Sequence, residues 1–407
     1  MKWIKRGVVA ALALALIGGV VYWDKFQDVR ALMAYSAVFE PETIDENFRT
    51  LYEKYPSITI ERSGPVAEFE VDKQPNTFPT TYSYEGQKLN TAELFDEFHW
   101  TGMIVLRDGK LIHEAYTRGN SAETHHIEFS VTKSLTSLLI GVAHDEGDLP
   151  DLNAQVTEFI PELKGTGYDG VTVQQVLDMT SGIRYVEDYD DLNSDIVQTV
   201  VATLRGSLDE FSTTIVRERE PGSFNQYASI ETQVLAWVLR RATGQDYADY
   251  FRDKLWSKIG AEADAKMLVD QEGEPLAFGG ASLRLQDLAR VGQMVLNGGT
   301  SMTGERVVSE EWLAQSITTN TPQSKPGDHG QSDFVLGYKN QWWIPENRDG
   351  GDFSAIGIYG QFLYINPSRG VVIAMNSAYP HYNEKPETEL KMVNALQAIA
   401  KHVSPGL

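Results

Sequence analysis

The order of strand-like and helix-like patterns constrains the fold of this chain more than any other feature. β-rich runs occupy 102–116 and 362–375, and helical periodicity fills 129–300 between them. The first run contains Asp108-Gly109, a dipeptide typical of hairpin turns because such turns need positive φ. Strands at both ends of a helical middle predict an α/β (α+β) fold, in which helices flank one antiparallel sheet built from distant segments. We expect a helical lobe, roughly 145–275, to be inserted between those segments.

Composition narrows the class of protein. The chain has 407 residues, of which 42% are hydrophobic, enough for a large core, and we expect 24–407 to form one domain. A net charge of −22 argues against a nucleic-acid partner, since the surface repels phosphate. The absence of cysteine excludes disulfides and thiolate chemistry. The eight histidines show no metal-ligand spacing, so we expect no metal and no cofactor.

The N-terminus predicts export. Lys2, Lys5 and Arg6 precede an uncharged run, Gly7–Trp23, and a basic start before an apolar stretch is typical of export signals. The run is long for a cleaved signal peptide, it approaches the roughly 17–25 residues of a membrane-spanning helix, and no A-x-A pattern ends it. We expect 1–23 to be a signal anchor, with a cleaved signal peptide as the alternative. The remaining chain would then lie outside the cytoplasm, in a periplasmic or other extracytoplasmic space.

The sharpest local motif is Ser130-Val131-Thr132-Lys133, at the start of the first helix of the middle segment. Residues three apart share a helical face, so the Lys133 amine can reach the Ser130 hydroxyl. The helix N-terminus supplies free N–H groups and a positive dipole end, which suit an oxyanion and disfavour a protonated lysine. The motif predicts Ser130 as a nucleophile and Lys133 as its base. Alone, the pattern equally fits a capping serine and an exposed lysine.

Two further motifs suit the same chemistry. Tyr227 follows a Pro-Gly turn, and a tyrosine hydroxyl beside a lysine can relay a proton to a leaving group. Gly357 and Gly360 open a C-terminal strand, where glycines let a substrate approach an edge closely. The N–H groups of Ser130 and Ile358 would then form an oxyanion hole. A packed loop aromatic and a strand bulge are the alternative interpretations of these two motifs.

Together the three motifs resemble the serine β-lactamase and penicillin-binding-protein superfamily, in particular its class C-like esterase and amidase branch. The resemblance covers roughly 85–400 and implies the β-lactamase/transpeptidase-like fold. Other phrases that carry it are 146–149, 161–163, 176–182, 278–282 and 287–290. Glu187-Asp188-Tyr189 resembles a loop of the 6-aminohexanoate-oligomer (nylon oligomer) hydrolases.

The resemblance implies that Tyr189 contacts the scissile amide, because the tyrosine of that loop does so in the nylon-oligomer enzymes. With Trp342, Trp343 and Tyr359 it would line an aromatic substrate-binding pocket. The same aromatic residues would equally suit a hydrophobic core.

The chain departs from the superfamily at two motifs. Tyr227-Ala228-Ser229 stands where the pattern is Y-x-N, and Ala355-Ile356-Gly357 stands where it is K-T-G. No lysine is therefore available at 355 to bind the carboxylate of a β-lactam by a charge-assisted contact. These departures favour esters or uncharged amides as substrates.

The sequence thus predicts a serine hydrolase that cleaves a small-molecule ester or amide through an acyl-enzyme on Ser130. A D-alanyl-D-alanine carboxypeptidase or β-lactamase is the first alternative. A non-catalytic envelope binding protein on the same scaffold is the second, and a membrane-tethered scaffold is the third.

Overall fold

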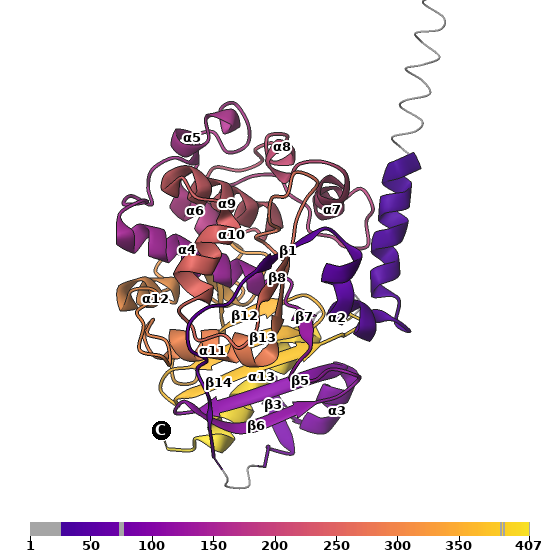
Figure 1. The fold of residues 1–407 in the computed structure, drawn as a ribbon, viewed down its shortest axis with the longest axis vertical. Helices are drawn as coiled ribbons and strands as arrows, with labels where there is room; N and C mark the ends of the chain where they lie inside the picture. Colours follow the sequence, from indigo (N-terminus) through magenta and orange to yellow (C-terminus); the bar gives the residue numbers. More distant parts are fainter. Residues whose placement is uncertain (1–25, 73–76, 383–384, 386, 407) are drawn as a thin grey trace, which may run out of the picture.

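An antiparallel sheet built from both ends of the chain forms the centre of the computed structural model, which describes residues 26–72, 77–382, 385 and 387–406 (Figure 1). Among the strands of this sheet that the structure describes, β2 alone runs parallel to its neighbour, β6. Within the described residues the spatial order of this eight-stranded sheet is β10 (Gly337–Lys339), β11 (Trp342–Ile344), β12 (Phe353–Gly357), β13 (Gln361–Asn366), β14 (Val371–Ser377), β5 (Trp100–Arg107), β6 (Lys110–Tyr116) and β2 (Glu70–Val71).

The pairing of β14 with β5 joins the two ends of the chain. Val371 lies opposite Arg107, and the antiparallel register continues to Asn376 opposite Gly102, after which it shifts by one residue. At the β5–β6 turn Asp108 and Gly109 both have positive φ, 51° and 78°, which an Asp-Gly hairpin requires. The predicted fold class, an antiparallel sheet flanked by helices, is confirmed.

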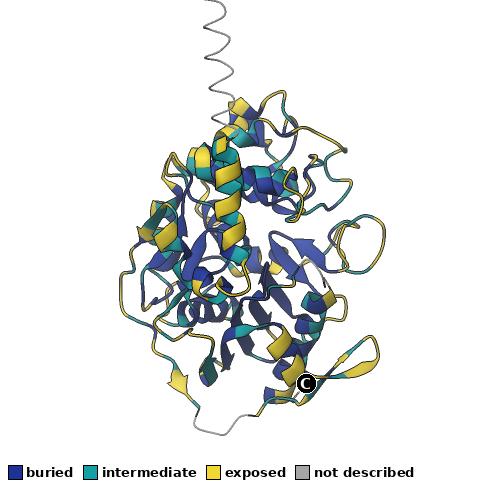
Figure 2. Ribbon diagram, turned by 90° about the vertical axis from the view of Figure 1, so that its right-hand side faces the viewer, coloured by how far each residue is buried: buried dark blue, intermediate teal, exposed yellow. Residues whose placement is uncertain are grey.

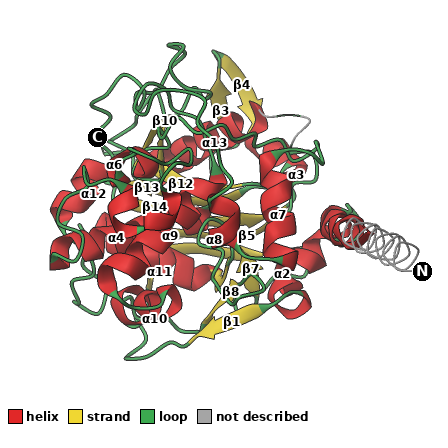
Figure 3. Cartoon of the chain, turned by 90° about the horizontal axis from the view of Figure 1, so that it is seen from above, coloured by secondary structure: helices red, strands yellow, loops and turns green. Residues whose placement is uncertain are grey.

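Helices cover both faces of the sheet (Figure 3). On one side lie α4 (Val131–Glu146) and α11 (Leu285–Leu296), and on the other lies α13 (Glu387–Val403). The first thirteen residues of α4 are all buried, so the turn that opens this helix lies inside the molecule. Gly147 ends α4 with a positive φ of 85°.

The helical middle lies above the sheet in Figure 1. It contains α5 (Val156–Phe159), η2 (Pro161–Leu163), α6 (Val173–Leu177), α7 (Asp195–Arg205), α8 (Leu208–Ser212), α9 (Ser229–Thr243), α10 (Tyr247–Phe251) and η3 (Arg252–Trp256). A second sheet of four strands has the order β1 (Ser57–Ile60), β8 (Ala265–Leu268), β9 (Ala281–Arg284) and β7 (His125–Ile127). Further elements are β3 (Thr81–Tyr84), β4 (Gln87–Asn90), α3 (Thr91–Glu97) and α12 (Glu310–Ser316).

The N-terminal part of the described chain packs along the helical region. Residues 26–36 form a helix with no buried residue, as Figure 2 shows. An ion pair between Asp28 and Arg205 joins this helix to α7. It is followed by η1 (Ala37–Phe39) and α2 (Ile44–Lys54), which contribute apolar side chains to the interior.

The anchor predicted for 1–23 lies outside the described residues and stays a prediction. Within the part of the chain that the structure describes, none of the helices is long and apolar enough to cross a membrane.

Candidate active site

The turn before α4 presents the side chain of Ser130. Phe129 has a φ of 44°, in the left-handed region that non-glycine residues rarely adopt, at a cost of about 1–3 kcal/mol. The rings of Phe48 and Tyr359 pack around Phe129, with centroids 5.0 and 5.7 Å away. Tertiary packing therefore holds a backbone conformation that a short peptide would avoid, and it aims Ser130 into the site.

Lys133 lies within hydrogen-bonding distance of Ser130. Its Nζ donates to Ser130 Oγ at 2.7 Å and to the carbonyl oxygen of Phe278 at 2.9 Å. The side chain is buried, and burial lowers the pKa of Lys133 to about 7, although the charge of Glu187 acts in the opposite direction. A lysine with this pKa is substantially neutral near pH 7, so it can accept the proton of a serine hydroxyl.

Tyr227 is the second side chain near the Ser130 hydroxyl, after Lys133. The Lys133 Nζ lies 4.8 Å from the centroid of the Tyr227 ring, which stacks on Trp343 at 5.4 Å. Burial, assisted by the charge of Glu187, holds the pKa of the Tyr227 hydroxyl well above its usual value, while a hydrogen bond with Ser130 acts to lower it. The phenol therefore stays protonated at neutral pH and has a proton to donate.

The end of β12 approaches the backbone of Ser130. A Cβ atom on Gly357 would lie 2.5 Å from the Glu128 carbonyl oxygen and 3.2 Å from the Ser130 nitrogen, so only glycine fits this position. Neither the Ser130 N–H nor the Ile358 N–H donates a hydrogen bond to another described residue. Ser130 and Ile358 line the same two cavities, and two such backbone donors have the composition of an oxyanion hole.

Glu187 also belongs to the site, although the sequence analysis gave this residue no role. Its carboxylate accepts hydrogen bonds from the Ser229 N–H at 2.9 Å, the Ser229 hydroxyl at 2.5 Å and the Tyr189 hydroxyl at 2.8 Å. The carboxylate thereby joins the loop after α6 to the first turn of α9. The only signal for it was its place two residues before Tyr189, since its partner Ser229 lies far along the chain.

Two cavities meet at Ser130. One is an apolar pocket of about 120 Å³, lined from 35–56, 129–130, 189, 196–204, 229, 268–279 and 358–359. The other is a larger cleft of about 680 Å³. This acidic cleft is lined by five carboxylates: Glu187, Asp188, Asp190, Asp333 and Glu389. No lysine or arginine of the described chain lines it. No group of three or more His, Asp or Glu in the described residues could hold a metal ion.

The predicted substrate-binding aromatics divide between core and cavities. Tyr189 lines both cavities, Trp343 lines the acidic cleft, and Tyr359 lines the apolar pocket. Trp342 lines neither: it is fully buried and packs edge-on against Phe353, with ring centroids 5.3 Å apart. The structure therefore places Trp342 in the core, the alternative interpretation of these aromatics, because neighbouring residues of a strand point to opposite faces.

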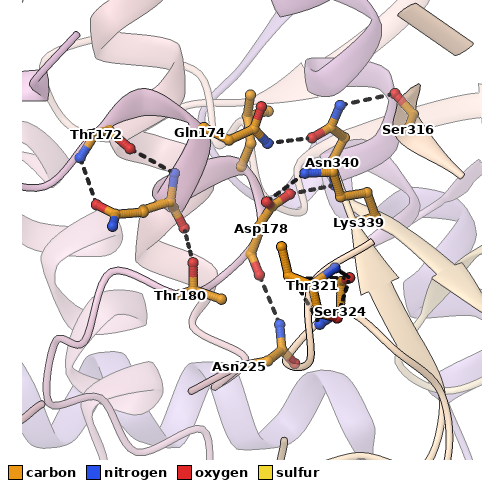
Figure 4. A network of polar contacts seen from close by, with 12 residues as sticks. Thr172, Gln174, Asp178, Thr180, Asn225, Ser316, Thr321, Ser324, Lys339 and Asn340 are labelled. Carbon is orange, nitrogen blue, oxygen red and sulfur yellow. Dashed lines mark hydrogen bonds and ion pairs between the residues drawn. The ribbon is translucent and has the colours of Figure 1, made fainter. Parts of the chain in front are cut away.

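A buried polar network supports the loop that carries Tyr227 (Figure 4). Lys339 of β10 pairs with Asp178 at 2.7 Å, and both side chains are 10% exposed. The Asp178 carboxylate also accepts a hydrogen bond from the Asn340 N–H at 3.1 Å. The backbone carbonyl oxygen of Asp178 accepts a hydrogen bond from the Asn225 side chain at 2.8 Å. Asn225 lies two residues before Tyr227, so this network fixes the segment that leads to Tyr227.

We expect Asp178→Ala to lower the free energy of unfolding by about 3–5 kcal/mol, because it leaves the Lys339 ammonium buried and unpaired. Urea unfolding followed by circular dichroism measures the change. The matched control is Glu146→Ala, which breaks the more exposed pair with Lys254 and should cost less than about 1 kcal/mol. Equal losses in the two variants would contradict a structural role for the Asp178 network.

The family model described as Beta-lactamase matches residues 92–396. A 6-aminohexanoate-dimer hydrolase of Paenarthrobacter ureafaciens is 36% identical over 342 residues, which cover 82% of this chain and 85% of that protein.

Solved structures have the same fold. A putative 6-aminohexanoate-dimer hydrolase from Bacillus anthracis superposes with a TM-score of 0.79 at 24% identity, over 90% of this chain and 96% of that one. A family VIII carboxylesterase superposes with a TM-score of 0.57 at 15% identity, over 77% of this chain and 97% of that one.

Proposed function

The chain belongs to the beta-lactamase family and is a serine hydrolase, and on this premise we propose that it cleaves an ester or an amide through an acyl-enzyme on Ser130. One observation carries the proposal: the Lys133 amine lies 2.7 Å from the Ser130 hydroxyl, and burial lowers its pKa to about 7. A base of this pKa beside a hydroxyl activates that hydroxyl as a nucleophile at neutral pH.

The proposed reaction has two halves. Neutral Lys133 takes the Ser130 proton as Oγ attacks the substrate carbonyl, and the oxyanion accepts hydrogen bonds from the N–H groups of Ser130 and Ile358. The proton passes through Tyr227 to the leaving alcohol or amine, and the bond to the leaving group breaks. Water then attacks the acyl-enzyme, its proton returns through the same groups, and Ser130 is restored.

The electrostatics of the acidic cleft favour esters and uncharged amides over β-lactams. The cleft has five carboxylates and no lining lysine or arginine in the described chain, and Ala355 stands where related enzymes have lysine. A β-lactam carboxylate would lack a partner and would face like charges. The name of the 36% identical relative, a 6-aminohexanoate-dimer hydrolase, supports an amide bond as the target.

We expect p-nitrophenyl esters to be turned over with a kcat/KM at least about 100-fold higher than that of benzylpenicillin or nitrocefin, because the β-lactam carboxylate loses a charge-assisted contact. Steady-state kinetics on residues 24–407, with an anilide as a third substrate, measure the ratio. Faster turnover of the β-lactams would favour the β-lactamase or carboxypeptidase alternative. A folded protein that turns over none of the three classes would favour the binding-protein alternative.

A further inference from the structure

The two cavities at Ser130 differ in character, and this difference bears on the substrate. Among the described residues, no charged side chain lines the apolar pocket. Its polar side chains largely donate to protein atoms already: Thr203 to the Thr199 carbonyl oxygen, Ser229 to Glu187, and Tyr55 to the Ala34 carbonyl oxygen. A ligand in this pocket therefore meets hydrocarbon and aromatic surface, with no charge to pair with its own.

The position of Tyr227 indicates which half of the substrate each cavity receives. Tyr227 lines the acidic cleft and does not line the apolar pocket, whereas Ser130 and Ile358 line both. In the proposed function the leaving group takes its proton through Tyr227, so the leaving group lies in the acidic cleft. The acyl half, on the other side of the carbonyl carbon, then enters the apolar pocket.

The size of the apolar pocket limits the acyl group. Its volume of about 120 Å³ is slightly smaller than a cavity of about 150 Å³ that holds benzene, with six carbon atoms. Its walls come from α7, the 268–279 segment and the N-terminal segment 35–56. Phe39 of that N-terminal segment stacks on Tyr359 at 4.8 Å. The pocket therefore suits an acyl chain of about five or six carbons.

We propose that the enzyme selects a medium-length hydrocarbon acyl group that carries no charge at its far end. This inference rests on the proposed function and adds the class of acyl group. It separates this chain from any hydrolase whose acyl half ends in an amine, such as a 6-aminohexanoyl group. An ammonium at the end of that chain would lose its hydration in a pocket that offers no carboxylate.

The decisive experiment compares two amides with the same leaving group, hexanoyl p-nitroanilide and 6-aminohexanoyl p-nitroanilide, which differ in a terminal ammonium. We expect kcat/KM to be at least about 100-fold higher for the hexanoyl amide, because the ammonium must be buried unpaired. In a series of p-nitrophenyl esters from acetyl to dodecanoyl, kcat/KM should be highest near pentanoyl and hexanoyl. Equal or faster cleavage of the 6-aminohexanoyl amide, or a maximum at acetyl, would overturn the inference.

A matched pair of variants on α7 tests the location of the acyl group. Val200 lines the apolar pocket and its neighbour Val201 does not. Val200→Phe fills the pocket, so the kcat/KM for the hexanoyl ester divided by that for the acetyl ester should fall at least about tenfold. This is the loss expected when about two methylene groups of the acyl chain can no longer be buried. Val201→Phe should leave the ratio unchanged, and an unchanged ratio in a folded Val200→Phe would contradict the assignment.

Failure of the underlying function has a different signature. If the proposed function is wrong, Ser130-dependent hydrolysis is absent for every ester, whatever the length of its acyl chain. If only the acyl assignment is wrong, hydrolysis stays intact and only the preference for chain length or charge differs from the expected one.

Discussion

Ser130→Ala should lower kcat/KM for an activated ester by about 10⁴-fold or more, and it should abolish covalent labelling by a serine-reactive fluorophosphonate. The expected loss is large because the hydroxyl is the atom that forms the acyl-enzyme, and the oxyanion donors alone supply only residual catalysis. Intact-protein mass spectrometry should detect one adduct on the parent protein and none on the variant.

Ser134→Ala is the matched control for this experiment. Ser134 lies one turn further along α4, where its hydroxyl donates to the Gln341 carbonyl oxygen at 2.6 Å and lines neither cavity at Ser130. The Ser134 variant should keep the adduct. An adduct that persists on a folded Ser130→Ala would place the nucleophile at another serine.

The second large effect concerns Lys133. Its folded-state pKa is lowered from 10.5 to about 7 by burial, and the amine accepts a proton only in its neutral form. Below pH 7 the amine is protonated and kcat/KM should fall tenfold per pH unit, while above pH 7 kcat/KM should level off. The pH profile of ester hydrolysis should therefore rise through an apparent pKa of about 7.

Lys133→Met should lower kcat/KM by about 10³-fold and remove the rise of kcat/KM around pH 7 from the pH profile, because a thioether of similar length accepts no proton. Lys88→Met, which removes an exposed lysine of β4, should change neither quantity. Circular dichroism checks that each variant is folded. A rise of kcat/KM centred near pH 10, or a rise near pH 7 that persists in Lys133→Met, would show that another group is the base.

The parts of the site that the sequence predicted are those set by local geometry. Ser130 and Lys133 are three residues apart on one helix, and their juxtaposition follows from helical periodicity alone. The roles of Tyr227 and Ile358 were inferred from a Pro-Gly turn and from strand glycines, and the resemblance gave these motifs most of their weight, since neither residue is near Ser130 in the sequence. The sequence could not decide between core and pocket for Trp342, because a strand of three residues is too short for its alternation to be visible in sequence.

The parts that the sequence missed depend on distant segments. Glu187 gains its role through Ser229, forty-two residues away, and no local pattern marks such a pair. The fold shows the same division. The β5–β6 hairpin carries a turn signal and two long runs, whereas β1 and β8 pair across more than two hundred residues with four residues each. Short strands carry too little periodicity to be recognised before their partner is known.

The wall that 35–56 adds to the apolar pocket lies outside 92–396, the segment matched by the family model. Two members of the family could thus share every catalytic motif and still differ in the acyl groups they accept, because part of the pocket wall lies outside the segment that defines the family. Exchanging 35–56 between relatives should therefore change the chain-length preference, provided that an aromatic side chain at position 48 still packs on Phe129. A protein trimmed to the matched segment would lose this wall together with Phe48, whose ring packs on Phe129 and helps to hold the turn that presents Ser130.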